Sequence, residues 1–302
     1  MGSFINDKSF IKPLYDLGIV EIFDGFPSND EEAYERAKDA DIILFCMMQF
    51  KNELLDKLDN LKIMQFVGTG VWNFVDVDYA LKKGIKVLNI EGYGNNAVAE
   101  FAIACAFNLA RKISKADRMM RNEIWDSGEL EGIEITGSTF GVIGTGNIGK
   151  LVAIKAAALG ARVLACDIYK SDELIEKYGI EYVDMDKIFR ESDIISIHLK
   201  ATKETNRIVG KKYISIMKNN ALFINVARAE LVDNEVLYQV LKDKKIAGAA
   251  IDVFDCEPPQ NFNMSKLDNV ITTPHVGFYT KKATDNSILM AIDSIIRETY
   301  TI

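Results

Sequence analysis

The chain has 302 residues, of which 48% are hydrophobic and 26% are charged, and its formal net charge is −8. This length and composition predict a globular protein with two domains. The acidic balance argues against a nucleic-acid partner, because phosphate binding requires clustered Lys and Arg side chains. The longest apolar stretch, residues 97–110, is too short to span a bilayer and contains Glu100 and Asn108, so no membrane partner is expected.

The cysteines and the amino terminus indicate the compartment. Four cysteines are scattered without a CxxC pair, and no histidine-rich segment accompanies them. This usage is typical of free thiols in a reducing compartment and predicts no metal site. The amino terminus lacks a basic stretch followed by an apolar one, so a secretory signal is not expected. We therefore predict a soluble cytoplasmic protein.

In the first third of the chain, strand-like apolar runs alternate with amphipathic helical runs. This alternation is typical of a parallel sheet covered by helices. Strands are expected at residues 41–46, 62–67 and 85–90, and helices at residues 29–38, 51–58 and 76–83. Residues 4–6 and 19–23 are short strand candidates in an opening segment whose structure the sequence leaves open.

A second alternation follows a long helix expected at residues 97–112. Residues 123–138 contain glycines and no clear periodicity, so they predict a loop. Beyond the loop, strands are expected at residues 139–143, 162–166, 194–198, 222–226, 248–253 and 270–272, and helices at residues 147–159 and 171–178. The fold class is therefore α/β, with a doubly wound parallel sheet in each of two domains.

A glycine-rich turn lies between the first strand and the first helix of this second alternation. Its sequence, Gly144-Thr145-Gly146-Asn147-Ile148-Gly149, fits the pattern G-x-G-x-x-G. The glycines permit a tight turn, a close approach of the backbone to a pyrophosphate, and close packing of helix and strand. The helix amino terminus supplies free N–H groups for the phosphates. This arrangement predicts a dinucleotide site.

Asp167 ends the next strand, about twenty residues beyond the glycines, where a ribose-binding carboxylate is expected. A carboxylate there accepts hydrogen bonds from the 2′-hydroxyl and repels a 2′-phosphate, so NAD is favoured over NADP. The alternative is a glycine-rich turn followed by an incidental acidic strand end.

The chain has only two histidines. His275 follows the strand expected at residues 270–272, which places it at the carboxyl edge of a sheet, where open α/β sheets bind ligands. His198 ends another strand, and for it a structural role and a functional role remain equally open.

The ordered motifs of the chain resemble those of the D-isomer-specific 2-hydroxyacid dehydrogenase family, from about Lys62 to about Thr280. The matching segments, in order, are Gly68-Thr69-Gly70, Ala97-Val98-Ala99-Glu100, Thr136-Gly137-Ser138-Thr139, the glycine fingerprint, His198 with Thr202 and Thr205, Asn225-Val226-Ala227-Arg228, Asp252-Val253-Phe254 with Glu257-Pro258, and Thr273-Pro274-His275. Each segment alone is weak evidence, but the ordered set is highly specific.

The resemblance implies catalytic roles for three residues. His275 would be the general acid in reduction and the base in oxidation, because an imidazole exchanges protons near neutral pH. Glu257 would orient the ring and favour its protonated form. Arg228 would bind the substrate carboxylate through its planar fork and polarise the keto oxygen. The expected substrate is therefore a small 2-keto or 2-hydroxy acid.

The resemblance also implies binding residues. Substrate binding is expected from Arg228 and His275, from Gly68, Thr69 and Gly70, and from Tyr93, for which simple packing is an equal alternative. The expected NAD-binding residues are Gly144, Gly146, Asn147, Ile148, Gly149, Asp167, His198, Leu199, Lys200, Thr205, Val226, Ala227, Arg228, Asp252, His275 and Gly277.

The family's architecture implies two Rossmann-like or flavodoxin-like domains, with the NAD domain inserted in the substrate domain. The substrate domain is expected at residues 1–96 and 278–302 and the NAD domain at residues 97–277, with the active site in the cleft between them and no further regulatory domain. A homodimer is expected, with residues 97–112 contributing to its interface. A different functional class stays open, because NAD(H)-sensing corepressors share this fold.

Particular substrates are favoured or disfavoured by single positions. Formate dehydrogenase activity is disfavoured, because those enzymes have Gln where Glu257 stands. Phosphoglycerate dehydrogenase activity is less favoured, because residues 46–50 offer no arginine for a phosphate. Lactate, 2-hydroxyisocaproate and glycerate or hydroxypyruvate chemistry all remain open.

The sequence departs from the family pattern at three places. Ala229 stands where glycine is usual, which would cost about 1 kcal/mol if the position needs a positive φ. Lys200 replaces a proline of the cofactor loop, and Glu91-Gly92 replaces a proline near Tyr93. None of these changes removes an expected catalytic group.

Overall fold

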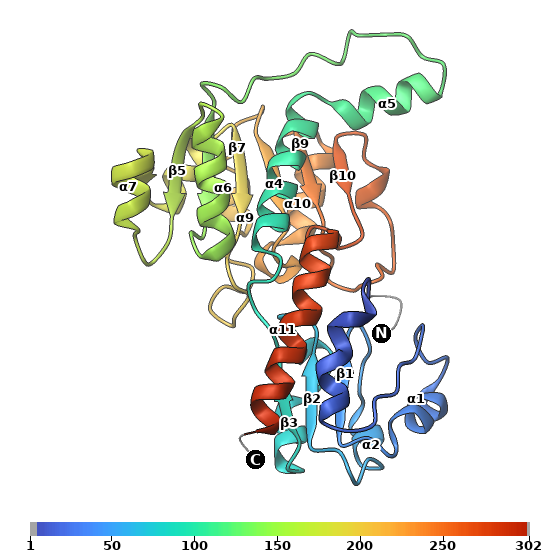
Figure 1. The fold of residues 1–302 in the computed structure, drawn as a ribbon. Helices are drawn as coiled ribbons and strands as arrows, with labels where there is room; N and C mark the ends of the chain where they lie inside the picture. The colour runs from blue at the N-terminus through green and yellow to red at the C-terminus, as the bar shows by residue number, and fades with distance from the viewer. Residues whose placement is uncertain (1–4, 301–302) are drawn as a thin grey trace. The chain divides into compact units, whose positions relative to one another are not determined.

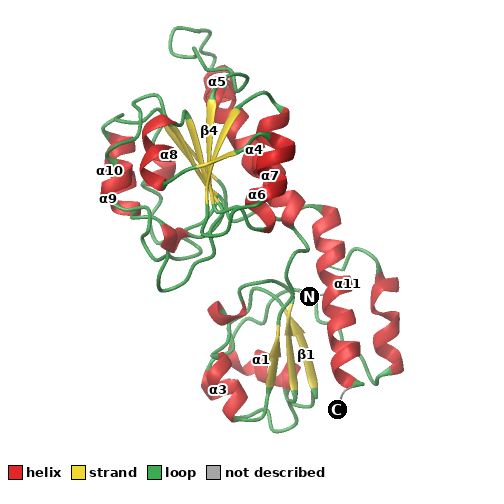
Figure 2. Cartoon of the chain, turned by 90° about the vertical axis from the view of Figure 1, so that its left-hand side faces the viewer, coloured by secondary structure: helices red, strands yellow, loops and turns green. Residues whose placement is uncertain are grey.

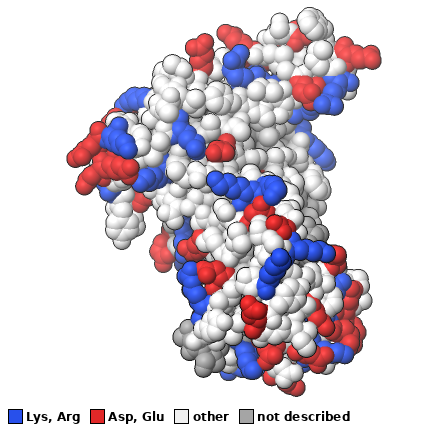
Figure 3. Space-filling model, in the orientation of Figure 1, with Lys and Arg blue, Asp and Glu red and all other residues white. Residues whose placement is uncertain are grey.

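The computed structural model describes residues 5–300. The chain forms two compact units, Met1–Gly94 with Tyr279–Ile302 (unit 1) and Asn95–Phe278 (unit 2), so the second unit interrupts the first in the sequence (Figure 1). Among the described residues, no helix is both long and apolar enough to cross a membrane. Figure 3 shows basic and acidic side chains interspersed over the visible surface of each unit.

Unit 2 is built on a seven-stranded parallel sheet in the order β10-β9-β8-β7-β4-β5-β6. The strands are β4 (Thr139–Ile143), β5 (Arg162–Cys166), β6 (Glu181–Tyr182), β7 (Ile194–Ile197), β8 (Leu222–Asn225), β9 (Gly248–Ile251) and β10 (Val270–Thr272). The central strands are mostly apolar, and all four residues of β7 are buried, Ser196 included, as expected for strands covered on both faces. The strand order reverses at β4, which creates a switch point at its carboxyl end.

Helices cover both faces of this sheet (Figure 2). One face carries α4 (Asn95–Ala110), α6 (Asn147–Ala158) and α7 (Asp172–Tyr178), and the other carries α8 (Met185–Glu191), α9 (Lys211–Ile214) and α10 (Asn234–Lys242). Helices α4 and α6 approach closely through small buried residues, among them Ala102 and Ala153. By contrast, α5 (Ile113–Arg121) has no buried residue.

Unit 1 has a three-stranded parallel sheet in the order β1-β2-β3. Its strands are β1 (Ile42–Phe45), β2 (Ile63–Phe66) and β3 (Lys86–Leu88), and its helices are η2 (Lys8–Asp16), α1 (Asp30–Ala37), α2 (Asn52–Leu55), η3 (Val71–Asn73), α3 (Val77–Lys82) and α11 (Lys281–Thr299). Helix α11 contacts β2 and η2, and its Ile288 and Ile292 form a buried cluster with Ile11. The last segment of the chain therefore completes the core of the first unit.

The α/β class with parallel sheets is confirmed, and the predicted strands from β1 onward lie within one or two residues of the observed ones. The strand expected at residues 19–23 is wrong: these residues form no strand, and Ile19 is 97% exposed. The expectation for residues 4–6 falls partly outside the described residues, and Ile5 and Asn6 are not in a strand.

Candidate active site

The glycine-rich turn joins β4 to α6 at the switch point of the unit 2 sheet. Gly144 has φ +88°, and a Cβ atom at Gly149 would lie 1.8 Å from the Gly144 carbonyl oxygen, so neither position accepts a side chain. At Gly146, which precedes the first residue of α6, nothing lies within 4 Å of a Cβ position, and no side chain caps the helix. The turn is therefore an open backbone cradle whose N–H groups fit the pyrophosphate of a dinucleotide.

The helix residues that follow Gly146 differ in their exposure. Asn147 is exposed, whereas Ile148 is half-buried and packs against the core of unit 2. Asn147 therefore borders the open cradle, and Ile148 anchors the helix behind it.

Asp167 follows β5 and binds the glycine turn directly. The Thr145 N–H donates to Oδ2 of Asp167 at 2.6 Å, and the Tyr169 N–H donates to its Oδ1 at 3.1 Å. The carboxylate thus positions the turn and retains free lone pairs for further donors. Next to it, Ile168 and Tyr169 are 88% and 79% exposed, and this apolar surface was not singled out from the sequence, although two apolar residues after a strand end could have indicated it.

His198 packs closely against the glycine turn. A Cβ atom at Gly144 would lie 2.8 Å from the His198 backbone carbonyl, and one at Gly149 would lie 3.1 Å from the His198 Cβ. The imidazole Nε2 is hydrogen-bonded to the Ser196 hydroxyl at 2.8 Å, whereas Nδ1 is fully enclosed and has no partner among the described residues. Burial lowers the pKa of His198 to about 3, so its ring is neutral at physiological pH and cannot act there as an acid.

The segment after His198 forms a compact turn beside the same glycines. The Leu199 side chain lies 3.0 Å from a Cβ position at Gly144. The Thr205 hydroxyl donates to the Lys200 carbonyl at 2.7 Å and accepts the Thr202 N–H at 2.8 Å. These hydrogen bonds close the turn, so the turn forms with lysine at position 200, where the family pattern has proline.

His275 follows β10 in a left-handed backbone conformation, with φ +53°. This conformation is uncommon for a residue other than glycine and requires support from its surroundings. Asp252, which follows β9 and is 1% exposed, provides it. The Asp252 carboxylate accepts the Thr273 hydroxyl at 2.5 Å and the N–H groups of Val276 and Gly277 at 2.9 and 2.8 Å. The carboxylate of Asp252 is therefore engaged within the loop that presents His275.

Glu257 binds the side chain of His275. Its Oε2 lies 2.7 Å from the imidazole Nδ1, and its Oε1 accepts the Phe254 N–H at 3.0 Å. Burial raises the pKa of Glu257, but the hydrogen bonds from His275 and Phe254 and the nearby charge of Arg228 outweigh burial and lower it below 4.5. Glu257 is therefore a carboxylate at neutral pH, and the distal Nε2 of His275 remains available for proton exchange.

Arg228 follows β8, the strand next to β9, so Arg228, Glu257 and His275 all lie beyond the carboxyl ends of three neighbouring strands. The Asn225 side chain donates to the Arg228 carbonyl at 3.0 Å and accepts the Ala227 N–H at 3.1 Å, and the Arg228 guanidinium donates to the Ala227 carbonyl at 2.7 Å. Val226 lies buried behind them. Ala229 begins a 3-10 helix without a positive φ, so the expected alanine penalty does not arise.

In unit 1, Gly68, Thr69 and Gly70 follow β2 and are fixed by the end of β3. The Ile90 N–H donates to the Gly68 carbonyl at 3.0 Å, the Asn89 amide donates to the Thr69 carbonyl at 2.9 Å, and the Thr69 hydroxyl donates to the Ile90 carbonyl at 3.2 Å. Tyr93 is half-buried and lies near the end of the first of the two segments of unit 1, Met1–Gly94.

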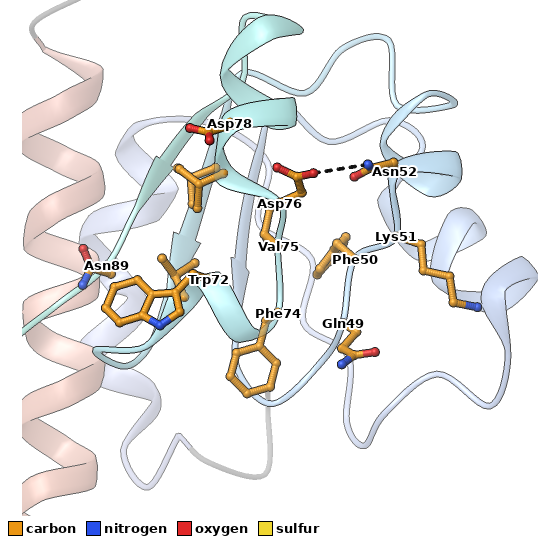
Figure 4. A pocket seen from close by; sticks show the side chains of 13 residues that line it. Gln49, Phe50, Lys51, Asn52, Trp72, Phe74, Val75, Asp76, Asp78 and Asn89 are labelled. Atoms are coloured by element: carbon orange, nitrogen blue, oxygen red, sulfur yellow. Dashed lines mark hydrogen bonds between the residues drawn. The ribbon is translucent and has the colours of Figure 1, made fainter. Parts of the chain in front are cut away.

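A cavity of about 820 Å³ lies within unit 1, beside this loop (Figure 4). Val71, the residue after Gly70, and Asn89 are among the residues that line it. Sequence reasoning did not identify this cavity, because its lining comes from segments that are far apart in the chain. Within residues 5–300, no group of three His, Cys, Asp or Glu side chains could hold a metal ion.

Comparisons with known proteins identify relatives of this chain. Residues 103–277 match the family model described as D-isomer specific 2-hydroxyacid dehydrogenase, NAD binding domain. The D-3-phosphoglycerate dehydrogenase of Methanocaldococcus jannaschii is 38% identical over 90% of this chain and 52% of its own length. The hydroxypyruvate reductase of Thermotoga maritima is 37% identical over 82% of this chain and 80% of its own length.

The chain belongs to the D-isomer-specific 2-hydroxyacid dehydrogenase family. Among solved structures, the D-lactate dehydrogenase of Lactobacillus jensenii with NAD+ matches 98% of this chain and 95% of its own length, with a TM-score of 0.78 and 30% identity. The two-domain Rossmann-like architecture is thereby confirmed, and the residues that match the NAD-binding-domain model all lie within unit 2. The chain spans about half the length of the Methanocaldococcus phosphoglycerate dehydrogenase.

Proposed function

We propose that this protein is an NAD-dependent dehydrogenase that interconverts 2-keto acids and D-2-hydroxy acids. The observation that carries the proposal is the 2.7 Å pair of Glu257 and His275, presented with Arg228 beyond three neighbouring strands of the sheet that also bears the glycine turn. A carboxylate-bound imidazole and a guanidinium are the groups that protonation of a keto oxygen and binding of a carboxylate require.

The roles of the side chains follow from their contacts. Glu257 holds Nδ1 of His275, so proton exchange occurs at Nε2, which donates its proton to the keto oxygen in reduction and accepts it back in oxidation. Arg228 binds the substrate carboxylate, because its fork matches the two oxygens. The N–H groups of Gly68, Thr69 and Gly70 supply further donors for that carboxylate, and Tyr93 contacts the substrate.

The glycine turn, Asp167 and the segment 198–205 would hold NAD(H). The pyrophosphate would bind the N–H groups at Gly146 and Asn147, and the remaining lone pairs of Asp167 would accept the ribose hydroxyls. Ile168 and Tyr169 would offer an apolar surface to the adenine ring. When bound, NADH supplies the hydride that reduces the carbonyl carbon.

A substrate panel tests the proposal. NADH oxidation is followed by absorbance with glyoxylate, pyruvate, hydroxypyruvate and longer 2-keto acids. Steady turnover with at least one of them is expected, and His275→Ala should reduce it by roughly two to four orders of magnitude while NADH still binds. An NAD(H)-sensing corepressor would bind NADH without turnover. Wild-type rates in the His275→Ala variant would refute the assignment of the acid.

We propose further that the protein is a homodimer whose interface includes α4 and α5. No residue of α5 is buried, and Ile113, Met120 and Trp125 are 55%, 54% and 89% exposed on this helix and the loop after it. Large exposed apolar side chains grouped in one segment are typical of a protein interface, and a second copy of the chain would cover them symmetrically. Figure 1 shows α5 and this loop extending along the edge of unit 2.

Light scattering after size exclusion tests the dimer. The wild type should have twice the mass of one chain, and Ile113→Asp with Met120→Asp should produce monomers. Leu81→Asp is the matched control, because Leu81 is 67% exposed but lies on α3. A monomeric wild type at micromolar concentration would contradict the proposal.

We also propose a reducing, cytoplasmic location, which the free thiols of Cys46, Cys105, Cys166 and Cys256 support. Thiol titration of the denatured protein, purified without reductant under nitrogen, should count all four thiols. A smaller count that reductant restores would argue against this location.

A further inference from the structure

The cavity of unit 1 continues directly from the loop that would bind the substrate carboxylate. Val71 and Trp72 line it and follow Gly70 in the chain, and Asn89 both lines it and holds the Thr69 carbonyl at 2.9 Å. A substrate carboxylate bound at Gly68, Thr69 and Gly70 would therefore lie next to residues that line the cavity.

The lining of the cavity suits a long side chain with an apolar body. The rings of Trp72 and Phe74 lie at one end of it, and the Val75 and Phe50 side chains lie between these rings and the polar end (Figure 4). Trp72 is 53% exposed, so its indole offers a large apolar face that a ligand could cover. The volume of about 820 Å³ lies within the range of small-molecule sites, whereas glyoxylate has no side chain to enter it.

The charges at the far end of the cavity exclude an anionic terminus. Asp76 and Asp78 line this end, and none of the salt bridges formed within residues 5–300 involves either of them. Asp76 accepts the Tyr79 N–H at 3.0 Å and the Asn52 amide at 3.5 Å, and both of these donors are uncharged. The lining cation Lys51 is paired with Asp30 at 2.8 Å.

From these observations we infer that the cavity receives the side chain of the substrate and selects 2-keto acids with a long, non-anionic side chain. The inference rests on the proposed function and names its substrate class. A terminal carboxylate or phosphate is rejected, because it would lie beside Asp76 and Asp78 without a free cation. Phosphorylated 2-keto acids are therefore poor substrates, although a phosphoglycerate dehydrogenase is among the relatives.

Three substrates separate chain length from charge. Glyoxylate has no side chain, 2-oxohexanoate has a four-carbon apolar chain, and 2-oxoadipate has nearly the same shape with a terminal carboxylate. We expect kcat/KM for 2-oxohexanoate to exceed that for each of the others at least tenfold. Equal values for 2-oxohexanoate and 2-oxoadipate, or a preference for glyoxylate, would overturn the inference.

Variants of the lining identify the site. Trp72→Ala should lower kcat/KM for 2-oxohexanoate at least tenfold and that for glyoxylate far less, which changes the ratio of the two. Phe26→Ala is the matched control, because Phe26 lies in the same unit, is 54% exposed and does not line the cavity. Asp76→Asn with Asp78→Asn should raise the ratio of 2-oxoadipate to 2-oxohexanoate at least threefold, and Asn at position 76 still caps α3. Unchanged ratios in both variants would refute the assignment.

A binding measurement separates this inference from the proposed function. In Trp125→Phe, Trp72 is the sole tryptophan, so its fluorescence reports ligands in the cavity. In the presence of NAD+, 2-oxohexanoate should change this fluorescence saturably and 2-oxoadipate should not. If no 2-keto acid is turned over but this response is observed, the proposed function fails and the ligand class stands. Turnover without any response would overturn the inference alone.

Discussion

Asp252 offers a sharp test of how the loop that carries His275 is held. Its carboxylate is 1% exposed and accepts three hydrogen bonds, from the Thr273 hydroxyl and from the N–H groups of Val276 and Gly277. Asp252→Ala leaves all three donors without an acceptor, and each buried unsatisfied donor costs about 1–3 kcal/mol. Three donors at this cost would give about 3–9 kcal/mol. Because the Thr273 and Val276 bonds are only part-buried, we expect the free energy of unfolding to fall by about 3–6 kcal/mol, a large part of the stability of a domain.

Two milder variants divide this effect. In Asp252→Asn one oxygen is kept, so only the donor on the amide side, Gly277 N–H, loses its acceptor, and the expected loss is about 1–3 kcal/mol. Thr273→Val removes only the hydroxyl donor and should cost about 1 kcal/mol. Urea unfolding followed by circular dichroism measures all three variants. Asp252→Asn within 0.5 kcal/mol of the wild type, or Thr273→Val as damaging as Asp252→Ala, would refute this account.

Three further predictions concern the reaction. Glu257→Gln should move the pH optimum of reduction to lower pH, because the imidazolium loses its charged partner. The pKa of Glu257 is lower in the folded state than in the unfolded state, so the stability that its ionised form contributes is present above the unfolded-state pKa and is lost as the pH falls through the folded-state pKa. Acid unfolding below about pH 4.5 should therefore differ between Glu257→Gln and the wild type. The wild type should prefer NADH to NADPH at least about tenfold in kcat/KM, and Asp167→Ala should narrow that preference; equal use of both cofactors by the wild type would contradict the role of Asp167. Arg228→Lys should raise KM for the 2-keto acid and lower kcat, because a point charge cannot reproduce the fork, and unchanged kinetic constants would show that Arg228 does not touch the substrate.

The parts of the fold that were predicted are those that depend on short-range pattern. Buried parallel strands are continuous apolar runs, and G-x-G-x-x-G forces a tight turn wherever it joins a strand to a helix, so β4, α6 and β5 could be located from local sequence alone. Residues 19–23 have the same apolar character but remain without a partner strand, because strand formation requires a neighbouring edge as well as a propensity. Helix α11 was not predicted, since its apolar residues are mixed with charged ones.

The candidate site shows the same division. The identities of Arg228, Glu257 and His275 were evident from motifs, whereas the contacts that position them were not. The buried bonds of Asp252 join residues more than twenty positions apart, and the sequence indicated only its presence in a motif. The tolerance of alanine at position 229 likewise depends on the backbone conformation, which the structure supplies.

The interruption of unit 1 by unit 2 has a consequence for synthesis of the protein. The ribosome delivers β1, β2 and β3 early, but α11, whose Ile288 and Ile292 pack against Ile11, emerges last. At roughly 5–20 residues per second, translation of residues 95–278 separates these events by about 10–40 s. During that interval unit 2 can fold completely, whereas the nascent first unit still exposes the apolar surface that Ile288 and Ile292 cover in the finished fold.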